Sequence, residues 1–114
     1  MTFFLTDAQR TLQSRARAFA AATVAPRAAE TDRLERYPTD SVAGMTRAGF
    51  MGLTIPRDLG GPGGGLLDAC LVIEEMAAVC GTTGRIAVEA NMGALGAVLR
   101  HGARKRAQRY GCRI

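Results

Sequence analysis

At 114 residues and 47% apolar content, the chain has the size and composition of one globular domain. Its three cysteines form no CxxC pair and have no histidine cluster beside them, so neither a disulfide framework nor a zinc site is indicated. The formal net charge of +5 comes from the arginines and the lysine after residue 99, which makes it a feature of the C-terminal tail and not of the whole fold.

The first predicted helix begins after Thr6, because Thr6 and Gln9 have the spacing of a capping box. Residues of one face then recur every three or four positions: Leu5, Ala8, Leu12, Ala16, Phe19 and Thr23. Pro26 is expected either to kink this helix or to occupy the first turn of a continuation that runs to about Arg33.

A second, short helix is expected with Thr39 as its N-cap and with Gly49 as the left-handed residue that ends it. Residues 51–56 are expected to be extended, because Ile55 precedes a proline and such residues avoid the helical region. The stretch IPRDLGGPGGG at residues 55–65 contains neither GxxxxGKS/T nor GxGxxG. We therefore interpret it as a tight turn and not as a phosphate-binding loop.

Two strongly apolar helices are predicted next, the first over residues 66–80 with Gly81 as its stop, the second from Arg85 to about Gly102. Helices that are apolar on almost every side are buried helices. The rest of the chain is too small to cover both, so we expect another domain or subunit to cover part of them. Cys70 and Cys80, on the first of the two, are expected to be core residues.

A short fifth helix over residues 103–110 completes the prediction. The expected fold is therefore all-α, with about five helices in an orthogonal or up-down bundle that forms one domain over residues 1–114.

Glu89 is the most unusual polar residue, because it is a carboxylate on one of the apolar helices. Helical spacing places it on one face with Ile86, Ala90 and Gly93, and that face is a candidate for lining an apolar slot. The alternative is that Glu89 reaches the surface or pairs with an arginine. No Ser/His/Asp, Cys/His, carboxylate-pair or metal-binding pattern occurs, so the residues alone indicate no catalytic site and no metal site.

The basic tail is open to two interpretations. Its arginines and lysine could neutralise phosphates, but Tyr110 is its only aromatic residue and no recognition helix precedes it. A solvated helix face is favoured, and no nucleic-acid partner is expected. Uncharged stretches such as residues 90–99 are too short to cross a bilayer, so no membrane association is expected.

Three segments, in this order and at these distances, carry a resemblance to a known family. They are residues 5–38, from LTDAQR to ERYP; residues 48–65, AGFMGLTIPRDLGGPGGG; and residues 71–110, which begin LVIEEMA and include GRIAVEANMG. Together they resemble the N-terminal α-helical domain of the flavin-dependent acyl-CoA dehydrogenases, and the resemblance covers residues 4–110.

The resemblance implies a larger enzyme. In that family a β-rich middle domain and a C-terminal four-helix domain follow and hold most of the FAD. A glutamate of the C-terminal domain removes the α-proton of an acyl-CoA while the β-hydrogen leaves as hydride to the flavin. The N-terminal domain packs on the C-terminal helices and walls the acyl-chain slot. The resemblance places substrate-binding positions at Ile86, Glu89, Ala90 and Gly93.

The chain departs from the family after QRY, where it runs GCRI instead of continuing into a middle domain. We therefore expect that it lacks the catalytic glutamate and most FAD contacts and does not turn over substrate alone. Its expected partners are an acyl-CoA, together with the missing domains, and a protein or a second copy on the apolar helices. The alternative is a helical interaction module, or a truncated remnant, that acts through the basic tail. The expected location is the cytoplasm, or the mitochondrial matrix in a eukaryote.

Overall fold

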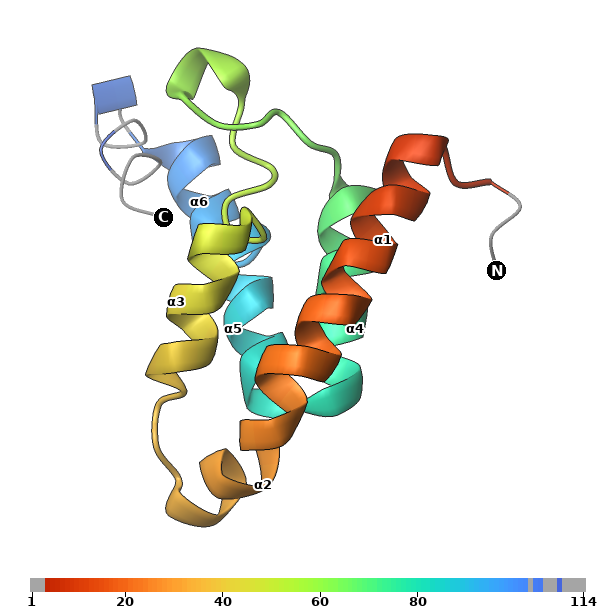
Figure 1. Cartoon of the computed structure of the whole chain (residues 1–114). Coiled ribbons are helices and arrows are strands. Elements are labelled where there is room, and N and C mark those ends of the chain that lie inside the picture. Colours follow the sequence, from red (N-terminus) through yellow and green to blue (C-terminus); the bar gives the residue numbers. More distant parts are fainter. Residues whose placement is uncertain (1–3, 103, 106–108, 110–114) are drawn as a thin grey trace.

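The structure is a computed structural model that describes residues 4–102, 104, 105 and 109. It contains six α-helices: α1 (Asp7–Phe19), α2 (Ala25–Leu34), α3 (Thr39–Ala48), α4 (Leu66–Val79), α5 (Gly81–Asn91) and α6 (Ala94–His101). A π-helical turn, η1 (Ala20–Val24), joins α1 to α2, and a 3-10 turn, η2 (Arg57–Leu59), interrupts the loop after α3. The described residues contain no strand, which confirms the all-α prediction (Figure 1).

The first predicted helix is confirmed, together with its capping box. Gln9 donates its backbone N–H to Thr6 Oγ1 at 3.2 Å, and Thr6 donates its own N–H to Gln9 Oε1 at 3.0 Å. Helix α1 continues through η1 into α2 without a break in the helical backbone, because the Ala25 N–H donates to the Ala20 carbonyl across η1. Pro26, which has no N–H to donate, lies in the first turn of α2 just after η1, in which the α-helical hydrogen-bond pattern is already interrupted.

Helix α3 begins one residue earlier than a Thr39 cap requires, so the predicted N-cap is wrong. Pro38 is the N-cap, and the Thr39 hydroxyl donates to the Tyr37 carbonyl at 3.4 Å instead of accepting an N–H from the first turn. The C-terminal prediction is confirmed, because Gly49 has a φ of 78° and ends α3 in the left-handed region.

The segment after α3 is folded into turns, so the predicted extended conformation of residues 51–56 is wrong. Gly52 has a φ of 70°, and the Ile55 N–H donates to the Gly52 carbonyl at 3.1 Å. The preference of Ile55 for an extended conformation is a local effect. Hydrogen bonds from Gly52, Leu53 and Thr54 to the end of α5, described below, determine the path of the chain instead.

The glycine-rich loop is a turn, as predicted, and its N–H groups are occupied. Three glycines donate to backbone carbonyls of the preceding segment, at 3.0, 2.9 and 2.8 Å: Gly61 to Pro56, Gly63 to Ile55 and Gly64 to Leu53. A Cβ at position 61 would lie 2.2 Å from the Ile55 carbonyl oxygen, so only glycine fits there. The loop therefore offers no cradle of free N–H groups to a phosphate.

Helices α4 and α5 meet at Cys80, which caps both. The Cys80 N–H bonds to the Met76 carbonyl at 3.0 Å, and the Cys80 carbonyl accepts from Gly84 at 2.9 Å. Gly81 therefore begins α5 and does not merely stop α4, so the predicted start of this helix at Arg85 is wrong. The two helices pack tightly, since a Cβ on Gly84 would lie 2.6 Å from the Cα of Ala77.

Helix α4 occupies the middle of the bundle, between α1 and α5 (Figure 1). The largest fully buried apolar side chains of the core come from α3, the segment after it, α4 and η1: Met45, Phe50, Met76, Val72 and Val24. Arg17 binds Glu75 across α1 and α4 with two hydrogen bonds, of 3.1 and 2.8 Å. The hydrogen bond and the charge of Glu75 raise the pKa of Arg17.

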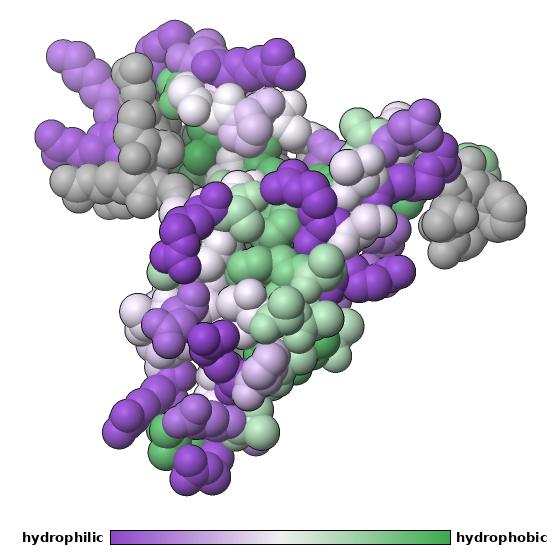
Figure 2. Space-filling view, in the orientation of Figure 1, coloured by the Kyte–Doolittle hydropathy of each residue, from purple (hydrophilic) through white to green (hydrophobic). Residues whose placement is uncertain are grey.

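One side of α4 is open to solvent. Cys80 is buried as predicted, but Cys70 is exposed, because it lies one turn from Leu66 and Leu67 on a side of α4 that no other helix of the described residues covers. Figure 2 shows apolar residues across the middle of the face on which α1 and η1 lie, between charged side chains at the edges. Cover by another domain or subunit stays a prediction.

No helix in the described part of the chain is long and apolar enough to cross a membrane. The predicted fifth helix over residues 103–110 falls largely outside the described residues. Of that segment, Arg104, Lys105 and Arg109 are described and are helical. Arg104 pairs with Asp58 of η2 at 3.4 Å, which places the start of the tail beside the glycine-rich loop.

Candidate functional site

An apolar groove of about 390 Å³ lies between α3, α5 and α6. Its lining is mostly aliphatic, with Glu89 as the only charged group: Tyr37, Val42, Thr46, Met51, Ile86, Glu89, Ala90, Ala94, Leu95 and Val98. Three of the four residues singled out in the sequence, Ile86, Glu89 and Ala90, therefore lie together on one wall. Gly93 is not part of the lining.

A break between α5 and α6 gives the groove its shape. The predicted single helix from Arg85 to Gly102 is wrong, because the chain turns at Met92 and Gly93 before α6 begins. Both of these residues donate their N–H to the Val88 carbonyl at 2.9 Å, which closes α5. The turn lets α6 bring Leu95 and Val98 to the groove from a second direction.

Asn91 is the residue that holds the break in place, and the sequence analysis did not identify it as a site residue. It is fully buried, and its amide nitrogen donates to the carbonyls of Phe50 and Ala87, each at 2.9 Å. Its amide oxygen accepts the Leu53 N–H at 2.8 Å. A signal was present in the sequence, because Asn91 is an amide on a mostly apolar, and therefore buried, helix. A buried amide needs several hydrogen-bond partners, so it marks a place where another segment must meet the helix.

The last carbonyls of α5 are satisfied by the same loop. Ala90 accepts the Gly52 N–H at 3.2 Å, and the Asn91 carbonyl accepts the Thr54 hydroxyl. A helix leaves its final carbonyls without intrahelical partners. Because the segment after α3 supplies those partners, α5 ends here and does not run on into α6.

The structure agrees with both interpretations of Glu89 drawn from the sequence, as a residue that lines an apolar slot and as the partner of an arginine. It lines the groove, and its Oε1 also pairs with Arg85 Nη2 at 2.5 Å. Its Oε2 accepts the Ala94 N–H at 2.8 Å, so the carboxylate lies at the N-terminus of α6. A negative charge there is stabilised by the helix dipole. Glu89 is thus a groove residue whose two oxygens are already occupied.

Arg85 lies at the rim of the groove, one helical turn before Glu89. Its side chain is 74% exposed, and the ion pair with Glu89 is its only interaction among the described residues. A guanidinium has five N–H donors, so this pair leaves donors free for a second anion. Arg85 is not among the lining residues, and its ion pair with Glu89 holds its guanidinium next to one of them.

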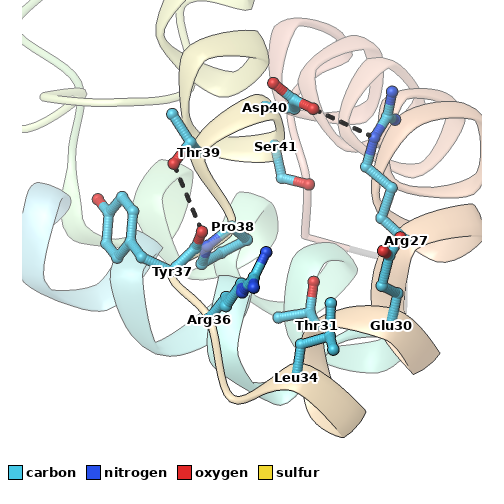
Figure 3. A pocket seen from close by; sticks show the side chains of 10 residues that line it. All are labelled: Arg27, Glu30, Thr31, Leu34, Arg36, Tyr37, Pro38, Thr39, Asp40 and Ser41. Carbon is cyan, nitrogen blue, oxygen red and sulfur yellow. Dashed lines mark hydrogen bonds and ion pairs between the residues drawn. The ribbon is translucent and has the colours of Figure 1, made fainter.

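A second, polar pocket of about 270 Å³ lies between α2 and the start of α3 (Figure 3). Two arginines and two acids face one another across it: Arg27, Arg36, Glu30 and Asp40. Arg27 and Asp40 are 3.9 Å apart. These charges balance, so the pocket selects neither an anion nor a cation. No group of three or more potential metal ligands occurs among the described residues.

The match to known proteins covers almost the whole chain. A family model described as the acyl-CoA dehydrogenase N-terminal domain matches residues 6–114. The 3-sulfinopropanoyl-CoA desulfinase of Variovorax paradoxus is 54% identical over 98 residues, which are 86% of this chain and 25% of that protein. The short-chain-specific acyl-CoA dehydrogenase of Clostridium acetobutylicum is 36% identical over 110 residues, or 96% of this chain and 29% of that protein.

A second desulfinase of the same name, from Paraburkholderia xenovorans, is 50% identical over 100 residues, which are 88% of this chain and 26% of that protein. The chain thus spans about a quarter of the length of the curated relatives that it matches.

Proposed function

Because the chain belongs to the acyl-CoA dehydrogenase family, as its N-terminal helical domain, we propose that the groove between α3, α5 and α6 is one wall of an acyl-chain site. The observation that carries the proposal is the apolar lining around Ile86, Ala90 and Leu95, with one carboxylate. Each methylene that such a wall covers contributes about 0.8 kcal/mol to binding. The opposite wall belongs to other domains of the enzyme.

The family is generally FAD-dependent, but the described residues do not fit a flavin dinucleotide. A pyrophosphate needs free N–H groups or cations, and the glycine N–H groups of residues 61, 63 and 64 are donated within their own loop. We propose that the flavin and the catalytic base are held by the other domains, and we assign this chain no step of the redox chemistry.

The substrate class that we propose is a short acyl-CoA whose acyl tail ends in an anion. Two relatives that are 54% and 50% identical are named for 3-sulfinopropanoyl-CoA, which carries a sulfinate. Arg85 supplies the matching cation at the groove, and it keeps donors available while it binds Glu89. A neutral short acyl-CoA is the second candidate, because the Clostridium acetobutylicum relative is named a short-chain-specific dehydrogenase.

A chimera tests the proposal. The residues of the Variovorax paradoxus desulfinase that match this chain are replaced by the 98 matched residues of this chain, and kcat/KM is measured with 3-sulfinopropanoyl-CoA and with butyryl-CoA. We expect turnover of the first substrate. Arg85→Ala should lower its kcat/KM about 10- to 150-fold, which corresponds to charge-assisted hydrogen bonds of about 1.5–3 kcal/mol. Butyryl-CoA should be affected far less.

Arg33→Ala is the matched control, because Arg33 is an exposed arginine of α2 outside the groove. A folded, flavin-loaded chimera without turnover would contradict the proposed function. Equal losses for both acyl-CoAs in Arg85→Ala would contradict the anionic substrate class and favour the neutral one.

A further inference from the structure

Gly93 touches the carboxylate of Glu89 although it does not line the groove. A Cβ at position 93 would lie 2.4 Å from Glu89 Oε2 and 2.9 Å from Glu89 Cδ. Cβ atoms do not approach other heavy atoms below 3.0 Å. Gly93 has a negative φ of −69°, so the glycine is not needed for a left-handed backbone. An added Cβ therefore meets the mobile end of the Glu89 side chain, so a side chain at position 93 shifts the carboxylate and not the backbone.

The position of the Glu89 carboxylate has two consequences for the groove. The carboxylate caps α6 through the Ala94 N–H and binds Arg85 with its other oxygen. Both oxygens are therefore held by partners at the edge of the groove, and the rest of the lining is uncharged. A side chain at position 93 displaces the carboxylate from the N-terminus of α6, and the displaced charge then competes for the space and for the arginine that an acyl tail uses.

We infer that Gly93 is a positioning residue that sets the selectivity of the groove between anionic and neutral acyl tails by fixing where the Glu89 carboxylate lies. The inference deepens the proposed function and rests on it for the identity of the ligand. It differs from a direct effect on slot depth, because Gly93 acts only through Glu89. A variant at position 93 should therefore lose its effect when Glu89 is absent.

The first readout is the backbone amide of Ala94 in the 114-residue chain, followed by NMR chemical shift and by hydrogen exchange. Gly93→Ala should lower the protection of this amide, measured relative to the intrinsic exchange rate of each sequence, about tenfold or more, because its hydrogen bond to Glu89 is lost. Gly96→Ala is the matched control: the same substitution is made in α6, where an added Cβ meets nothing within 4 Å. The control should leave the Ala94 amide unchanged.

A double-mutant cycle with Glu89→Ala separates the two mechanisms. In the Glu89→Ala background, Gly93→Ala should cause no further loss of protection of the Ala94 amide, once the intrinsic exchange rate is corrected for the new preceding residue. If the effect persists in that background, Gly93 acts directly and the inference is overturned. If Gly93→Ala alone unfolds the chain, recovery of a folded spectrum in the double variant supports the inference, and continued unfolding overturns it.

The second readout is binding of 3-sulfinopropanoyl-CoA and butyryl-CoA to the same chain, observed at the methyl groups of Ile86 and Leu95. Gly93→Ala should weaken binding of the anionic acyl-CoA at least tenfold more than binding of the neutral one, and Glu89→Ala should remove that difference. Equal weakening overturns the inference. If neither acyl-CoA binds to this one wall alone, the same comparison is made as kcat/KM in the chimera, where an absence of turnover contradicts the proposed function, and the Ala94 amide still decides whether Gly93 positions Glu89.

Discussion

Replacing Asn91 by alanine tests whether the buried amide holds the groove-forming break together. The substitution removes the hydrogen bonds of the side chain and leaves two buried backbone groups without their partner, the Leu53 N–H and the Phe50 carbonyl. Each orphaned group costs about 1–3 kcal/mol, so the expected loss in the free energy of unfolding is about 4 kcal/mol. That is a large part of the 5–15 kcal/mol or so by which domains are stable.

The loss is measured by urea unfolding and by thermal unfolding, both followed by far-UV circular dichroism. For a domain of this size, at roughly 4 °C per kcal/mol, we expect Tm to fall by about 16 °C. Thr82→Ala is the control, because Thr82 is an exposed polar residue of the same helix, and its change should stay within about 0.5 kcal/mol. A loss below about 1 kcal/mol in Asn91→Ala would refute the account of the break given above.

Two further predictions concern the packing of α4. Gly84→Ala should destabilise the fold by about 1–3 kcal/mol in urea unfolding, because the new Cβ meets the backbone of Ala77 at 2.6 Å. Gly81→Ala, at a glycine with nothing within 4 Å of an added Cβ, should not, and equal effects of the two would contradict the close α4–α5 contact. Arg17→Met should lower the unfolding midpoint at low salt by breaking the pair with Glu75, and the difference from wild type should shrink at high salt. A difference that salt leaves unchanged would show that the pair does not act through its charge.

The local signals in the sequence predicted the ends of elements well where those ends depend on neighbouring residues. The capping box of Thr6 and Gln9, the stop at Gly49 and the tolerance of Pro26 all involve groups within four residues of one another. Propensity and capping rules describe that range. The glycine-rich turn was predicted on another basis, the absence of the phosphate-loop motifs, and the structure shows that its N–H groups bond to the segment just before it.

Two of the errors share a physical cause, which is pairing between distant segments. The periodicity of residues 85–101 is helical throughout, and nothing in it marks a break. The break depends on partners about 40 residues away along the chain, at Phe50 and Leu53. The same hydrogen bonds bend the segment that was predicted to be extended. One long-range interaction therefore accounts for both corrections.

The two alternatives predicted for Glu89, lining the groove and pairing with an arginine, are both present in the structure. The sequence placed Ile86, Glu89 and Ala90 on one face, and the groove confirms that they lie together. The spacing could not show that Arg85 and the Ala94 N–H each take one oxygen of the carboxylate, because Ala94 belongs to a helix that the sequence did not separate. Gly93 was counted as a member of the same face for that reason, and it lies instead at the turn.

These contacts join two of the three segments that carry the family resemblance into one structural unit. The two segments are residues 48–65 and residues 71–110. The segment after α3 caps α5 through Gly52, Leu53 and Thr54, and α5 in turn caps α6 through Glu89. Each cap satisfies backbone groups that a helix end leaves open. The wall of the groove is therefore held by backbone hydrogen bonds, while its lining consists of side chains that make few of them. If the groove binds an acyl chain as proposed, we expect changes at Arg85 or Gly93 to alter its preference with less cost to the fold than a change at Asn91, which removes the wall itself.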